Sequence, residues 1–90
     1  MFGRKIVFSK ECDAAAEILG GYEQIDGSLD GFLEALDRNP HGFPKVETDW
    51  GSVRYIRTRK AGNVPPLLWR FTIDREGSVE IVHVEEYQDY

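Results

Sequence analysis

The stretch LLWRFTIDREGSVEIVHVEE, residues 67–86, contains two β-strand patterns separated by a short polar turn. In residues 67–74 the apolar side chains at every second position share one face of a strand: Leu67, Trp69, Phe71 and Ile73. The turn Arg-Glu-Gly-Ser at 75–78 is typical of a hairpin, and residues 79–86 are again rich in valine and isoleucine. The stretch therefore predicts an antiparallel hairpin with one strongly apolar face, which needs a second layer to cover it.

The first element that could form this layer is a helix over about residues 11 to 19. Its small and apolar residues have helical spacing: Cys12, Ala15, Ala16 and Leu19. Ser9 or Asp13 is a candidate N-cap. Gly20 and Gly21 are expected to end the helix, because glycine adopts the left-handed conformation without a steric penalty.

A second helix follows Ser28, which is a favourable N-cap residue. It is expected to stop at Asn39, because a residue before a proline is pushed out of the helical region. Its apolar side chains have the i, i+3, i+4, i+7 spacing of one helix face: Leu29, Phe32, Leu33 and Leu36.

Two further strands are predicted, over residues 4–9 and 52–60. Residues 40–51 contain two prolines and two glycines and are predicted to form a loop. The resulting order is β-α-α-β-β-β. It predicts an α+β, two-layer fold, with a helical hairpin packed on one face of a mostly antiparallel four-stranded sheet, in a single domain over residues 1–90. The other face of this sheet is left to solvent or a ligand.

Composition excludes several classes of function. The chain of 90 residues has a formal net charge of −5, which argues against bulk nucleic-acid binding. A single cysteine excludes an internal disulfide framework and fits a reducing cytoplasm. No apolar run suggests a membrane span or a secretory signal, so we expect a cytoplasmic protein. His41, His83 and Cys12 lack metal-ligand spacing and no glycine-rich phosphate loop follows a strand, so neither metal nor cofactor is expected.

One segment is basic, although the chain as a whole is acidic. Residues 53–62, VRYIRTRKAG, carry four cations and no acid: Arg54, Arg57, Arg59 and Lys60. One interpretation is a solvated edge strand, since cationic side chains commonly protect exposed sheet edges. Another is a local anion site for a phosphate backbone or an acidic partner peptide, because local charge can differ from the total.

With these features together, the chain resembles the RelE/ParE superfamily of bacterial toxin-like proteins over most of its length. The resemblance depends on the opening strand KIVFS, the helix end LDRNP, the arginine-bearing strand VRYIRTR and the hairpin LLWRFTIDREGSVEIVHVEEY. It implies the toxin component of a bacterial type II toxin–antitoxin system, with an antitoxin protein as partner. For members that are ribosome-dependent mRNA endonucleases it also implies the ribosome and mRNA as partners.

The nucleases of this family have basic strand residues and an aromatic residue or histidine near the C-terminus. The resemblance therefore nominates four catalytic residues: Arg57, Arg70, His83 and Tyr87. It also nominates three nucleic-acid-binding residues: Arg54, Arg59 and Lys60. RNA cleavage by 2′-OH attack needs a proton acceptor, cations for the phosphorane charge and a donor for the leaving oxygen, which these side chains supply. Strand alternation predicts that His83 shares the face of Val79 and Ile81.

The sequence also departs from the family pattern. PPLLW replaces the usual tyrosine–arginine start of the third strand, and acids follow His83 at Glu85, Glu86 and Asp89. The catalytic pattern is thus degenerate, whether the chain is an enzyme stays open, and the alternative is a non-catalytic RelE-fold module that binds a protein partner. A gyrase-inhibiting function is a third option, to which no residue is assigned.

Individual side chains have structural alternatives too. His83 is also explained as a structural histidine that caps a strand or pairs with Glu85. Trp50 is a further candidate for an exposed contact, and Tyr90 is an alternative source of the phenol that otherwise closes the end of the core. Trp69 and Phe71 are expected in the core rather than stacked on bases.

Overall fold

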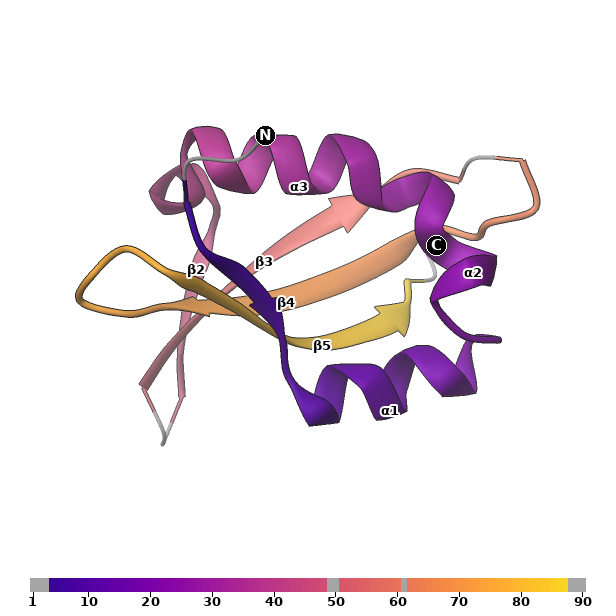
Figure 1. Ribbon diagram of the computed structural model, residues 1–90, viewed down its shortest axis with the longest axis horizontal. Coiled ribbons are helices and arrows are strands. Elements are labelled where there is room, and N and C mark those ends of the chain that lie inside the picture. Colours follow the sequence, from indigo (N-terminus) through magenta and orange to yellow (C-terminus); the bar gives the residue numbers. More distant parts are fainter. Residues whose placement is uncertain (1–3, 49–50, 61, 88–90) are drawn as a thin grey trace.

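The computed structural model describes residues 4–48, 51–60 and 62–87, which form one helical layer and one sheet (Figure 1). The α-helices are α1 (Lys10–Ile18), α2 (Tyr22–Ile25) and α3 (Leu29–Arg38), with 3₁₀ turns η1 (Asp26–Ser28) and η2 (Pro40–Gly42). The strands are β1 (Ile6–Phe8), β2 (Lys45–Thr48), β3 (Gly51–Thr58), β4 (Leu67–Ile73) and β5 (Val79–Glu86). The predicted α+β class is confirmed. The candidates Trp50 and Tyr90 lie outside the described residues.

The sheet has five strands in the order β1-β5-β4-β3-β2. β1 runs parallel to β5, and the other neighbours are antiparallel. The prediction of four strands is wrong, because β2 lies within the segment 40–51 that was expected to be a loop. Its four residues pair with the start of β3, from Lys45 opposite Arg54 to Thr48 opposite Gly51. So short a strand, next to a proline and with Val46 49% exposed, carries little periodic apolar signal.

One face of the sheet is buried under the helices. Six residues of β4 and β5 that point to this face are almost fully buried: Leu67, Trp69, Phe71, Val79, Ile81 and Val84. Phe32 of α3 stacks on Trp69 with ring centres 4.9 Å apart. The indole N–H of Trp69 donates to the Thr58 hydroxyl at 3.4 Å, so its polar atom has a partner within the apolar layer. The alternation in residues 67–74 thus identified the core face correctly.

The helices do not form the predicted hairpin. Figure 1 shows α1 and α3 at opposite margins of the sheet, with α2 between them near one end. Ile25 at the end of α2 is 1% exposed, so the connection itself contributes to the core. Ser28 precedes α3, but its hydroxyl donates back to the Ile25 carbonyl at 2.8 Å and makes no cap hydrogen bond. Because η1 runs directly into α3, the helix start at Ser28 is correct and its predicted capping role is wrong.

The predicted ends of the first helix are confirmed. The Ser9 hydroxyl accepts a hydrogen bond from the Cys12 backbone N–H at 3.0 Å, as an N-cap should. At the other end, Gly20 has φ +100° and the N–H of Gly21 donates to the Ala16 carbonyl at 2.8 Å. The first bond satisfies an N–H and the second a carbonyl that the helix ends otherwise leave without partners.

A β-bulge in the β4–β5 ladder determines which side chains reach the other face. Arg70 pairs with His83, but the next residue Phe71 pairs with Ile81, so Val82 is an extra residue on β5. Val79 and Ile81 consequently point into the core, whereas Val82 and His83 both line the opposite face. The prediction that His83 shares the face of Val79 and Ile81 is therefore wrong. Strict alternation does not hold across a bulge.

The turn between β4 and β5 is built as the sequence indicates. The Asp74 carboxylate accepts hydrogen bonds from the backbone N–H groups of Glu76 and Ser78, both at 2.9 Å. Gly77 has φ +85°, and its carbonyl accepts a hydrogen bond from the guanidinium of Arg4 at 2.7 Å.

Across the described residues, no helix combines the length and the apolar character that crossing a membrane requires.

Candidate functional site

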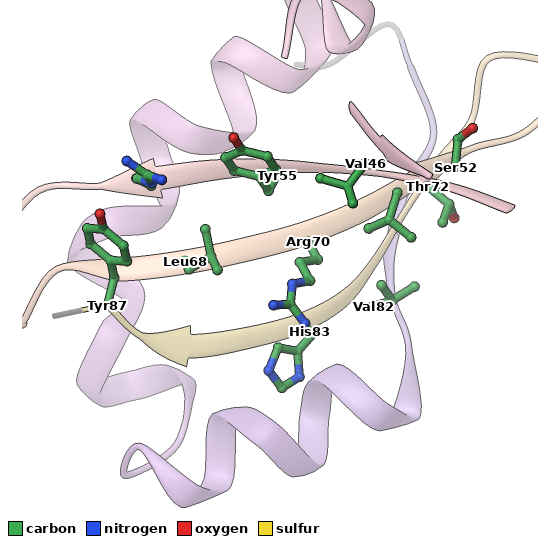
Figure 2. Close-up of a pocket in the computed structure, with 11 residues that line it drawn as sticks. Val46, Ser52, Tyr55, Leu68, Arg70, Thr72, Val82, His83 and Tyr87 are labelled. Atoms are coloured by element: carbon green, nitrogen blue, oxygen red, sulfur yellow. The ribbon is translucent and has the colours of Figure 1, made fainter. Parts of the chain in front are cut away.

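The sheet face away from the helices carries a shallow depression of about 700 Å³, here called the open-face cavity (Figure 2). Its residues come from the four strands β2 to β5 and from Tyr87, which directly follows β5. The lining residues are Val46, Ser52, Val53, Tyr55, Arg57, Leu68, Arg70, Thr72, Val82, His83 and Tyr87. Valine and leucine side chains thus form much of a floor from which a few charged and aromatic groups project.

All four side chains predicted to be catalytic line this one cavity: Arg57, Arg70, His83 and Tyr87. Arg70 of β4 and His83 of β5 are directly paired across the ladder. On the other flank of Arg70, the ladder pairs it with Tyr55 of β3. Strand pairing therefore places a phenol, a guanidinium and an imidazole in one row across the open face, because directly paired residues point to the same side.

Arg57 lies between two tyrosine rings. Its guanidinium carbon is 4.5 Å from the ring centre of Tyr87 and 5.8 Å from that of Tyr55. A guanidinium at these distances is attracted to the electron-rich ring faces. Such stacking orients the planar fork of donors while leaving its edge available for hydrogen bonds to an anion.

An acid partly offsets this positive charge. The guanidinium of Arg70 forms an ion pair with the Glu85 carboxylate at 3.1 Å, and the two side chains are 48% and 44% exposed. Glu85 therefore pairs with Arg70, whereas the structural explanation of His83 had predicted a pair between Glu85 and His83. A half-exposed pair of this kind contributes only roughly 0.2–1 kcal/mol, so an incoming anion can compete for Arg70.

The basic segment divides between two roles. Arg54 pairs with Phe71 in the ladder, so it points to the helix-covered side and not into the open-face cavity. There its guanidinium donates to the carbonyls of His41 and Phe43, at 3.1 and 2.7 Å. Arg54 therefore fastens the loop before β2 to the sheet. Arg59 and Lys60 follow the end of β3 and are exposed.

Several residues of the cavity were not identified from the sequence. Tyr55 was detectable, since it precedes Arg57 by two residues and therefore shares its strand face. Val82 was detectable too, because alternation from the core-facing Val79 and Ile81 points it to the other face, and the bulge then turns His83 to that same side. Leu68 and Val46 look like ordinary strand residues in the sequence, and only the pairing of β2 to β4 shows that they are neighbours of the charged groups.

A second group of ionisable side chains lies on α1 and α2, away from this cavity. The Tyr22 hydroxyl donates to the Asp13 carboxylate at 2.7 Å. Burial, followed by the hydrogen bond to Asp13, raises the pKa of Tyr22 above its ordinary value of 10.0. Burial likewise raises the pKa of Cys12 above its ordinary value of 9.0. Both groups therefore stay neutral in the folded protein at physiological pH and support the fold rather than chemistry.

Within the described residues, no group of three or more histidine, cysteine, aspartate and glutamate side chains is arranged to hold a metal ion.

Comparison of the chain with protein families, curated proteins and solved structures finds no match. Function is therefore inferred from the residues of the open-face cavity. Two guanidinium groups, an imidazole and two phenols on an apolar floor suit a ligand with both an anionic group and a flat ring.

Proposed function

We propose that this chain is a RelE/ParE-like toxin of a type II toxin–antitoxin system and that the open-face cavity binds and cleaves single-stranded RNA. The observation that carries the proposal is that Arg57, Arg70, His83 and Tyr87 line one cavity although they come from three separate segments of the chain. RNA offers what this cavity suits, since each nucleotide joins a phosphate anion to a flat base.

The proposed roles follow from the chemistry of each side chain. His83 is the proton acceptor for the attacking 2′-hydroxyl, because a neutral imidazole has one unprotonated ring nitrogen that can accept a proton. Arg70, directly across the ladder from His83, balances the charge that develops on the phosphorane. Arg57 holds an adjacent phosphate, and Tyr87 provides a ring for a base and a phenol to donate to the leaving oxygen.

Glu85 does not prevent this chemistry. Its ion pair with Arg70 is half exposed and weak, whereas a charge-assisted contact between arginine and phosphate is among the stronger hydrogen bonds of proteins. Phosphate therefore displaces Glu85 at moderate cost. The same residue keeps the cavity from being strongly basic, which fits an acidic chain that acts on one strand rather than on bulk nucleic acid.

The direct test is cleavage of single-stranded RNA by the purified protein, with and without ribosomes, together with growth after induction in cells. Replacing His83→Gln is expected to reduce the cleavage rate by about 10²–10⁴-fold, the usual contribution of a general base. The matched control is His41→Gln, because His41 is exposed and lies outside the open-face cavity. Intact RNA and unchanged growth with a folded wild-type protein would refute the proposal. An equal loss of cleavage rate in the His83→Gln and His41→Gln variants would also refute it.

A second candidate is a non-catalytic binding module on the same scaffold. It is favoured by the Arg70–Glu85 ion pair, which already neutralises one cation, and by the apolar floor of the cavity. This module would retain a protein partner in a pull-down without any RNA cleavage. Charge reversal at Arg57 would weaken that binding, and unchanged affinity would exclude the open face as the contact.

A further inference from the structure

The outer edge of β3 is covered over only part of its length. Pairing of β2 with β3 runs from Thr48 opposite Gly51 to Lys45 opposite Arg54, and it ends there. One more bond follows, from the Tyr55 N–H to the Pro44 carbonyl at 3.2 Å. Figure 2 shows β2 beside one half of β3 only. On this outer side, the half toward the C-terminal end of β3 has no strand next to it among the described residues.

Pro44 is the reason that the ladder stops. A proline has no N–H, so it has no donor for the carbonyl of Tyr55. The chain before it is drawn to the helix-covered side, where the Phe43 ring meets Phe71 edge-on at 5.7 Å and its carbonyl accepts from Arg54. The loop that leads into β2 therefore turns away from the edge of β3 at Tyr55.

Strand geometry then identifies the unpaired groups. In a strand, the N–H and C=O of one residue point to the same side, and the side alternates along the chain. Since the N–H of Tyr55 points toward β2, the N–H and C=O of Arg57 also point outward. In the part of the chain that the structure describes, no backbone group pairs with Arg57 from that side. The edge thus offers the Tyr55 carbonyl and both polar groups of Arg57 to another strand.

The side chains beside this edge are cationic. Arg57, Arg59 and Lys60 are exposed, and no acid occurs in residues 53–62. Self-pairing with a second copy is disfavoured, because antiparallel pairing about Arg57 sets arginines against each other. An acidic strand is instead attracted to these cations. The net charge of −5 on the whole chain repels such a strand only weakly, since charges beyond about 10 Å are screened at ordinary salt.

We propose that the free edge of β3 from Tyr55 to Thr58, with Arg59 and Lys60 directly after it, binds an extended acidic peptide segment as an additional β-strand. Backbone hydrogen bonds to Arg57 supply the register, and carboxylates at alternate positions of the peptide meet the cationic side chains. Tyr55 and Arg57 also line the open-face cavity, but the binding proposed here uses their outward-pointing backbone groups, so the inference does not rest on the proposed RNA chemistry. It explains three of the four cations in the basic segment, while Arg54 has its structural role.

The test uses the full chain and a fluorescent peptide of about eight residues in which glutamate alternates with valine or threonine. Binding is measured by fluorescence anisotropy, and the exchange rate of the Arg57 amide is measured by NMR with and without peptide. The matched control peptide has the same sequence with N-methyl groups on the amides that face the protein. It keeps the charge and loses the hydrogen bonds.

The expected result is binding of the first peptide, at least about tenfold weaker binding of the N-methylated one, and slowed exchange at Arg57 in the complex. Combining Arg59→Glu with Lys60→Glu is expected to lower affinity at least about tenfold. Arg75→Glu, in the exposed β4–β5 turn, is expected to leave affinity within about twofold. Absence of binding, equal affinity for both peptides or unchanged Arg57 exchange would each overturn the proposal. These readouts use the wild-type protein, and RNA cleavage by the same preparation is scored separately, so either proposal can fail alone.

Discussion

The two faces of β4 share one backbone and have opposite environments. Three of the residues that point to the helices are fully buried: Leu67, Trp69 and Phe71. The residues between them line the open-face cavity and keep contact with solvent: Leu68, Arg70 and Thr72. The covered face is held by apolar packing, including the stacked pair Phe32 and Trp69. The open face is organised by weaker contacts, such as the ion pair between Arg70 and Glu85.

This difference separates stability from chemistry. Burial of large side chains contributes several kcal/mol per residue, whereas half-exposed ion pairs contribute a fraction of that. Substitutions on the open face can therefore change binding with little loss of fold, while substitutions on the covered face unfold the protein. For a chain of 90 residues with one core this division matters, because few compensating contacts exist.

The largest effect is expected at Trp69. Truncation to alanine removes a fully buried ring and its stacking on Phe32, so Trp69→Ala is expected to lower the free energy of unfolding by about 3–5 kcal/mol. The matched control is the neighbouring Leu68→Ala on the open face, which is half-buried and should cost about 1 kcal/mol. Chemical denaturation monitored by circular dichroism measures both. Equal costs would contradict the contrast between the faces.

The second-largest effect is expected from alkaline pH, which should lower the stability of the folded protein. Folding raises the pKa of Cys12 above 9.0 and that of Tyr22 above 10.0, so the folded state favours the protonated forms. The resulting stability is complete below these ordinary values and is lost as pH rises through the folded pKa values. We therefore expect the melting temperature to fall above about pH 9, which thermal unfolding at a series of pH values can follow.

The control for this pH dependence is Tyr22→Phe, which removes the titrating hydroxyl that donates to Asp13 and keeps the ring beside Phe8. Its melting temperature should decline less steeply with alkaline pH than that of the wild type. Identical slopes in the two proteins would mean that other groups cause the decline and would remove Tyr22 from the explanation.

The smallest effect on stability is expected at Glu85. Glu85→Gln releases Arg70 from a half-exposed ion pair, so the free energy of unfolding should change by less than about 1 kcal/mol. Affinity for single-stranded RNA should rise by about two- to fivefold, because Arg70 no longer has a competing carboxylate. Glu86→Gln is the control, since Glu86 pairs with Leu67 and does not line the cavity. A similar gain in both variants would indicate a general charge effect.

Some features were accessible from local patterns. Strand alternation identified β4 and its core face, and the residues of β5 were predicted without error. The ends of α1 and the stop of α3 before Pro40 followed from glycine and proline chemistry. β2 and α2 were missed, because four-residue elements carry too little periodicity to stand out.

The candidate site was only partly accessible. The sequence nominated Arg57, Arg70, His83 and Tyr87, and all four line one cavity. It grouped Arg54 with the other cations, although strand pairing turns Arg54 to the covered side, where it binds two carbonyls. It also placed His83 on the wrong face, because nothing in residues 79–86 marks the extra residue Val82.

By itself, therefore, the amino-acid sequence determined the α+β class, the apolar face of β4 and the concentration of positive charge before residue 61. Each depends on intervals of a few residues, over which periodicity and charge are encoded locally. Only the tertiary structure decided which cations share a surface, where the β5 bulge turns His83 outward and where Pro44 leaves the edge of β3 unpaired. These depend on pairing between distant segments, where register is settled by how whole strands pack and not by any one residue.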